Sequence, residues 1–244
     1  EGQVWYNTTS TVLKGYGQIG AGAWAAGGTL NTGRNAGGAA GSSTAGLVIA
    51  GQITEPPTAN CESYDGTSWT EIANTPTNIR YNVGFGSQTA AVTGGGHTPA
   101  GNYGALNYTW NATSWTANNA MNTGRAAMGG TGTSTAGIIM AGITSPSDKQ
   151  DITETFDGTT WTEVADLNTA MAYSSAGGSQ TAALRVFGSV PPSTIPPNQK
   201  TVEEWNGTSW TEVNDLNQAR NSTSSASKDG TTSAMFVWGG SSPA

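Results

Sequence analysis

Short apolar segments recur along the chain, and each one ends in glycine. They read TAGLVIAG, TAAVTGGG, TAGIIMAG, TAALRVFG and TSAMFVWG, and they begin at residues 44, 89, 135, 181 and 232. Apolar runs of this length that are bounded by glycine and turn residues predict buried β-strands. A stretch rich in Gly and Ala precedes each run, and a Gly/Ser/Thr turn separates the two. We therefore expect each pair to form the first and second strands of an antiparallel unit.

A second pattern supplies two more strands in each unit. The hexapeptides YDGTSW, WNATSW, FDGTTW and WNGTSW begin at residues 64, 110, 156 and 205. Asp-Gly or Asn-Gly between two strand-like segments predicts a hairpin with a type I′ turn, because both central residues of that turn take positive φ. Each unit is therefore expected to hold four antiparallel strands.

The units repeat along nearly the whole chain. Their tryptophan anchors follow one another at 45, 46, 46 and 49 residues, at Trp24, Trp69, Trp115, Trp161 and Trp210. Four antiparallel strands at this spacing favour the blade of a β-propeller. The first unit lacks the apolar second strand and the last lacks the tryptophan half, so the two half-units would complete one shared blade.

The predicted fold is therefore all-β. It is a five-bladed propeller of four-stranded antiparallel blades over residues 12–244, with one blade shared between the N- and C-terminal strands, after a lead-in segment of residues 1–11. An open solenoid, which would leave both half-units unpaired, is the less favoured alternative. The low apolar content of 35% suggests disorder, but regularly spaced tryptophans favour a folded core.

Composition narrows the classes of partner. The net charge is −7, and nine scattered Lys and Arg residues do not form a phosphate-binding surface, so no nucleic-acid partner is expected. The apolar runs are too short to cross a bilayer, so no membrane insertion is expected. The single cysteine, Cys61, excludes an intrachain disulfide and favours a buried apolar role. Because the chain begins with Glu1, it is expected to be a processed product or a fragment.

The repeat resembles the Kelch repeat. The shared features are an arginine near the first strand, an apolar strand that ends in Gly-Gly, and an aromatic residue about six positions before a tryptophan. The glycine pair is intact at residues 95–96 and 239–240 and is degraded in the other units. This resemblance implies a fold rather than a function.

Longer phrases are similar to the Kelch-like virion proteins of marine phages, cyanophages especially. They are VEEWNGTSWTEVNDLNQAR at 202–220 and GSQTAALRVFG at 178–188, and the opening EGQVWYNTTSTVLKGY resembles segments of phage tail-fibre proteins. The resemblance implies a structural component of a virion, such as a tail fibre, appendage or surface decoration. The implied partners are other virion proteins, further copies of the chain and a host-surface glycan, with no cofactor.

Arginines in the repeat are the first candidates for a site. They are Arg34, Arg80, Arg125 and Arg220, with Met171 at the same position of the remaining unit. A ring of guanidinium groups at a channel mouth could hold carboxylates or anionic sugars. The alternative, which is favoured, is a structural bond to inter-blade carbonyls or to the acids that follow each tryptophan: Glu71, Glu163, Glu212, Asp166 and Asp215.

Aromatic residues and loops are the second set of candidates. The repeated tryptophans could stack on sugars, but packing between blades is the favoured interpretation. Trp5 and Tyr103 fall outside the repeat core and are candidates for exposed ligand contacts. The loops at 52–60, 97–105, 143–151 and 189–200 vary most and are expected to project from one face, where ligand binding and subunit contacts are equally compatible with them.

Catalysis has little support in the sequence. His97 is the only histidine, and no His or Cys set has metal-ligand spacing. No GxSxG or phosphate-binding loop stands between a strand and a helix. A non-enzymatic virion protein is therefore the favoured function, a bacterial extracellular adhesin or carbohydrate-binding propeller is the alternative, and an enzyme comes third.

Overall fold

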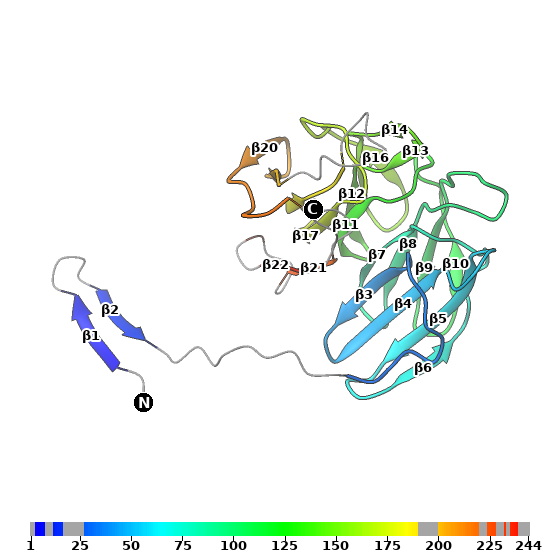
Figure 1. Cartoon of the computed structure of the whole chain (residues 1–244), viewed down its shortest axis with the longest axis horizontal. Coiled ribbons are helices and arrows are strands. Elements are labelled where there is room, and N and C mark those ends of the chain that lie inside the picture. The colour runs from blue at the N-terminus through cyan, green and yellow to red at the C-terminus, as the bar shows by residue number, and fades with distance from the viewer. Residues whose placement is uncertain are drawn as a thin grey trace.

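The computed structural model describes residues 27–189 and 200–219, together with residue 232 and four short terminal strands. Strands β1 (Gln3–Asn7) and β2 (Val12–Tyr16) pair as a hairpin, which lies apart from the other sheets in Figure 1. The predicted boundary between residues 11 and 12 falls within this hairpin, and the limits of the propeller domain stay a prediction. No helix of the described part is long and apolar enough to cross a membrane.

Four antiparallel sheets of four strands follow one another along the chain, and we number them blades 1 to 4 (Figure 1). Blade 1 contains β3 (Gly38–Ser42), β4 (Ala45–Gly51), β5 (Thr58–Tyr64) and β6 (Trp69–Ile72). Blade 2 contains β7 (Val83–Gly86), β8 (Ala91–Gly94), β9 (Asn107–Trp110) and β10 (Trp115–Ala117). Blade 3 contains β11 (Gly129–Thr133), β12 (Ala136–Met140), β15 (Thr153–Phe156) and β16 (Trp161–Glu163). Blade 4 contains β17 (Ser175–Ser179), β18 (Ala182–Val186), β19 (Val202–Trp205) and β20 (Trp210–Val213).

The predicted all-β class and the four strands of each unit are confirmed. The Gly- and Ala-rich first strands of neighbouring blades contact one another in order, β3 with β7, β7 with β11 and β11 with β17. Small side chains suit this place because first strands crowd together where blades converge. The apolar second strands lie behind them and carry fully buried residues such as Ile49, Val92 and Ile139.

Aromatic pairs fill the space between consecutive blades. Within each blade the pair lies across the third and fourth strands, as in Trp110 and Trp115, whose ring centroids are 5.2 Å apart. That pair packs against Leu47 and Ile49 on the second strand of blade 1. The same arrangement joins blade 3 to blade 2 and blade 4 to blade 3. The interpretation of these tryptophans as packing residues therefore agrees with the structure.

The hairpins between third and fourth strands differ from the predicted type I′ turn. Tyr64 pairs with Trp69, which leaves a loop of four residues, and Gly66 has a φ of +95° whereas Asp65 does not have positive φ. The Asp65 carboxylate accepts hydrogen bonds from the backbone N–H groups of Thr67 and Ser68, both at 2.8 Å. These bonds lower the pKa of Asp65. The side chain therefore replaces the tight turn as the organiser of the loop, and Asn111, Asp157 and Asn206 act in the same way.

A fifth sheet is described only in part. Strands β21 (Ser224–Ser227) and β22 (Met235–Trp238) pair antiparallel, and β21 contacts β17 of blade 4. A groove of about 380 Å³ separates blade 4 from this sheet, and Leu184, Val186, Met235 and Val237 are among its lining residues. In the other blades an aromatic pair covers the position of Leu184 and Val186. Trp24 and most of the N-terminal half-unit lie outside the described residues, so closure through a shared fifth blade stays a prediction.

Replacing Trp24 by alanine tests this closure. If Trp24 covers Leu184 and Val186, Trp24→Ala should lower the free energy of unfolding by about 3–5 kcal/mol, because it empties a buried aromatic site. Chemical denaturation followed by tryptophan fluorescence measures the change, and Trp5→Ala serves as the control. Equal stability of the two variants would contradict the shared blade.

Candidate functional site

Buried glutamates on the third strands hold the segments that connect successive blades. In blade 3, the Glu154 carboxylate accepts hydrogen bonds from the backbone N–H and side-chain amide of Asn122, at 2.8 and 2.9 Å. Its other oxygen accepts from Arg125 Nη1 at 2.6 Å, and both charged side chains are fully buried. In blade 1, Glu62 binds Asn31, Thr32 and Arg34 in the same way. We call these segments, residues 31–36, 76–81, 122–127 and 168–173, the inter-blade links.

Blade 4 keeps the glutamate but takes its arginine from another strand. Glu203 accepts from the Asn168 backbone N–H at 2.8 Å, although the arginine position of this link is Met171. Arg185, on β18 directly opposite Glu203, supplies the guanidinium group. In blades 1 and 3 the position of Arg185 is apolar, Val48 opposite Glu62 and Ile139 opposite Glu154. The buried charge pair is thus retained while its cation has moved.

Blade 2 has lost the pair, and this corrects the predicted position of Arg80. Backbone bonds from Gly51 and Gly96 reach Ile79 and Arg125, respectively, so Ile79 is the counterpart of Arg125 and Arg80 lies one residue later. Tyr108 occupies the place of the glutamate, and both it and Ile79 are buried in the core between blades 1 and 2. Two buried core residues therefore replace the ion pair, and the Arg80 side chain, which is 20% exposed, pairs with Glu55 instead.

The predicted ring of arginines is consequently not formed by the described residues. Arg34 and Arg125 are buried in their glutamate pairs, and Arg220 lies outside the described part of the chain. Burial lowers the pKa of Arg125, the Glu154 charge opposes this shift, and arginine stays protonated. The structural interpretation fits Arg34 and Arg125, but the predicted partners, the acids that follow each tryptophan, were wrong. The partners stand two residues before each aromatic of the third strand, a recurrence that the sequence displays.

One residue from each link joins a series of backbone hydrogen bonds, which we call the backbone arc, at one end of the channel. Tyr81 N–H donates to Ala36 O at 2.6 Å, Ala127 N–H to Tyr81 O at 2.9 Å, and Tyr173 N–H to Ala127 O at 2.8 Å. All four residues have φ between +55° and +58°. The loops after the second strands begin at this same end, because isolated bridges join each link to the start of its loop. We call this end the loop-side mouth.

Aromatic side chains gather at the loop-side mouth. The rings of Tyr81 and Tyr173 meet edge to face, with centroids 5.9 Å apart, and Tyr81 is 37% exposed. Burial and then the neighbouring hydroxyls of Tyr81 and Tyr103 raise the pKa of Tyr173, so its hydroxyl keeps its proton at neutral pH. Tyr103 also meets the ring of His97 edge to face at 5.1 Å. Four rings from the units of blades 2 and 4 thus form one cluster.

Polar groups border this cluster. The Arg80 guanidinium lies 5.7 Å from the centre of the Tyr81 ring, donates to Gln52 Oε1 at 2.7 Å and pairs with Glu55. Gln52 in turn donates to Glu55 at 2.8 Å, and the Glu55 side chain is 66% exposed. Of the predicted site residues, the structure therefore brings Arg80 close to Tyr103, with His97 paired through its backbone to both. Gln52 and Glu55 belong to the loop 52–60 that the sequence prediction named, Tyr81 and Tyr173 were missed by it, and only the backbone of Trp5 is described.

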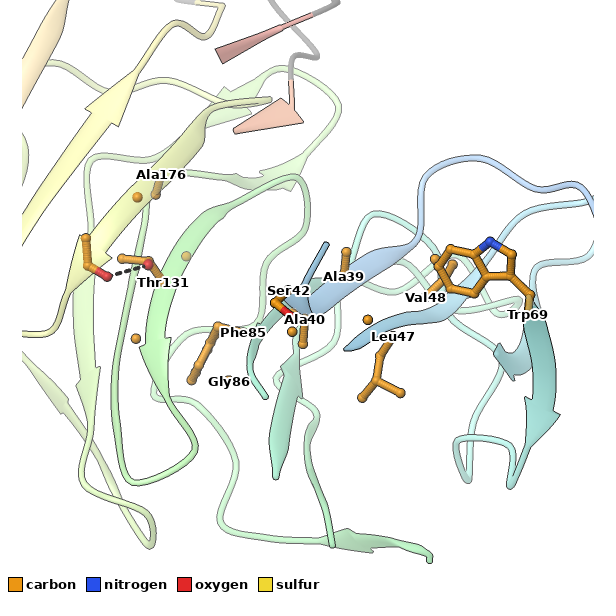
Figure 2. A pocket seen from close by; sticks show the side chains of 17 residues that line it. Ala39, Ala40, Ser42, Leu47, Val48, Trp69, Phe85, Gly86, Thr131 and Ala176 are labelled. Carbon is orange, nitrogen blue, oxygen red and sulfur yellow. Dashed lines mark hydrogen bonds between the residues drawn. The ribbon is translucent and has the colours of Figure 1, made fainter. Parts of the chain in front are cut away.

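The channel has fewer polar and charged side chains than the loop-side mouth. A cavity of about 420 Å³ is lined mainly by the first strands of the four blades, and Figure 2 shows Ala39, Phe85, Thr131 and Ala176 around it. The Thr131 hydroxyl donates to Gly178 O at 2.8 Å, and no residue that lines the cavity is charged. The described residues contain no group of three or more His, Cys, Asp or Glu side chains that could hold a metal ion.

One solved structure shows what this architecture resembles. The structure of YjhT, a Kelch-repeat β-propeller protein, superposes with a TM-score of 0.72 and covers 99% of this chain and 85% of its own. The identity is 14%, so the likeness concerns the fold alone. The fold is that of a Kelch-like β-propeller. No protein-family model and no curated protein sequence matches the chain.

Moving the cation of blade 4 tests the buried pair. Arg185→Ile should lower the free energy of unfolding by about 3–5 kcal/mol, because it leaves the Glu203 carboxylate buried without its cation. Adding Met171→Arg recreates the arrangement of blades 1 and 3 and should restore part of that loss. Denaturation of the two variants and of Met171→Arg alone measures the coupling. Additive effects would show that the two cation positions are not equivalent.

The Cys61 thiol should be chemically silent in the folded protein. It is 1% exposed, and burial raises its pKa, so little thiolate forms near neutral pH. A thiol-disulfide reagent at pH 8 should label Cys61 only after denaturant unfolds the chain. Rapid labelling of the native protein would mean that the core between blades 1 and 2 opens readily.

Proposed function

We propose that this chain is a non-enzymatic structural protein of a phage virion, such as a tail fibre, an appendage or a surface decoration. It presents a rigid propeller for contact with a host-surface glycan or with other virion proteins, and it assembles with further copies of itself. The observation that carries the proposal is the contrast between uniform blades and a variable loop-side mouth. The resemblance of residues 178–188 and 202–220 to virion proteins supports the phage assignment.

The bonds made by the buried glutamates support a scaffold that presents binding residues over a catalytic site. Glu62, Glu154 and Glu203 each accept bonds from a link and from an arginine. Acids tied up in this way stabilise blades and cannot serve as proton donors to a ligand. The side chains that differ from unit to unit, in contrast, lie at the loop-side mouth, as binding residues on a fixed scaffold commonly do.

An extracellular bacterial adhesin or carbohydrate-binding propeller is the second candidate. The aromatic cluster of Tyr81, Tyr103 and Tyr173 favours it equally, because such a surface suits a sugar whichever particle or cell carries it. Localisation therefore separates the two candidates.

Purification of particles from a lysate whose phage encodes this chain tests the proposal. Quantitative mass spectrometry should find the protein in gradient-purified particles at a constant ratio to the capsid protein, and antibodies to the propeller should label a single part of the particle. A protein found only on bacterial surfaces would support the adhesin instead. Turnover of a sugar by the purified chain would overturn the non-enzymatic assignment.

A further inference from the structure

Two tyrosines occupy positions at which the equivalent residue of other links is alanine. Ala36, Tyr81, Ala127 and Tyr173 occupy equivalent positions in the backbone arc, each with φ between +55° and +58°. A bulky side chain is uncommon in this left-handed region, and strained residues of this kind cluster at functional sites. Because Ala127 both donates and accepts in this arc, as Tyr81 does, the backbone bonds do not require tyrosine in the links to blades 2 and 4.

Burial does not account for Tyr81 either. Its exposed fraction of 37% makes it one of two large apolar side chains among the described residues that remain exposed. Tyr173 holds its ring edge to face at 5.9 Å, and main-chain bonds hold both residues in place. A fixed aromatic surface loses little conformational entropy when a ligand covers it.

The charge around Tyr81 indicates which kind of ligand suits it. Arg80 is the cation nearest to this ring, and Glu55 and Gln52 already bind its guanidinium group. An anionic ligand would have to displace Glu55 on a chain of net charge −7. A neutral ligand with several hydroxyl groups can instead donate to the exposed Glu55 carboxylate while its apolar face covers a ring.

We propose that the loop-side mouth binds a residue of a neutral glycan. The C–H face of the sugar lies against Tyr81 and Tyr173, and its hydroxyls bind Glu55 and Gln52. Tyr103 lies beside Tyr173, and His97 packs against Tyr103 at the same mouth. This inference rests on the proposed function, since it assigns to one place the glycan contact that was left open there.

Saturation-transfer NMR on the whole chain tests the site. The probes are the methyl glycosides of glucose, galactose, mannose and N-acetylglucosamine, with methyl glucuronide as the anionic comparison. At least one neutral glycoside should bind and receive saturation mainly at its ring C–H protons, and the glucuronide should bind more weakly. Tyr81→Ala should weaken binding about tenfold or more, whereas Tyr81→Phe keeps the ring and most of the affinity.

Tyr81→Ala gives this residue the side chain already present at Ala36 and Ala127, so the variant should fold, and circular dichroism and thermal unfolding check this. Ser42→Ala, in the wall of the channel cavity, is the matched control and should bind as the parent protein does. Absence of binding to every neutral glycoside, preference for the glucuronide, or unchanged binding by Tyr81→Ala would each overturn the site. Particle association is measured separately: binding through Tyr81 by a chain absent from particles would contradict only the virion assignment, and a particle protein without binding would contradict only the site.

Discussion

A buried carboxylate on the third strand of a blade fixes the link that enters that blade, and much of the architecture depends on this interaction. Glu62, Glu154 and Glu203 are desolvated, so each must have its oxygens satisfied, and the segment that arrives from the preceding blade provides the donors. The bond therefore does two things at once. It satisfies a buried charge, and it sets where one blade ends and the next begins.

The need to satisfy buried charges also explains why the blades differ in their charged residues. Blade 4 keeps its acid and recruits Arg185 when its link offers Met171, whereas blade 2 loses both charges and packs Ile79 near Tyr108. Removing a buried charge together with its partner avoids the cost of leaving either one unpaired. Aromatic pairs between blades are less variable, since they fill a volume that every junction must fill.

Most of the fold could be predicted because tandem repeats display the same pattern several times. Strand number, strand order and the packing role of the tryptophans follow from it. The turn around Asp65 could not be derived, because a side chain rather than a dihedral preference organises it. Arg80 was aligned with the wrong position because TNIR is similar in sequence to NTGR. Only the backbone bond to Ile79 shows that Arg80 lies one residue after the arginine position of the other links. The tyrosine cluster could not be predicted, because its members come from more than one unit and meet only when the blades surround a common axis.

The backbone arc at the loop-side mouth has an evolutionary consequence. Its bonds run from one main chain to the next, so they hold the blades together whichever side chain stands at these positions. Alanine and tyrosine already alternate there without disturbing the geometry. A population of such proteins can therefore exchange residues at these positions and alter what the surface recognises, while the scaffold underneath is inherited unchanged.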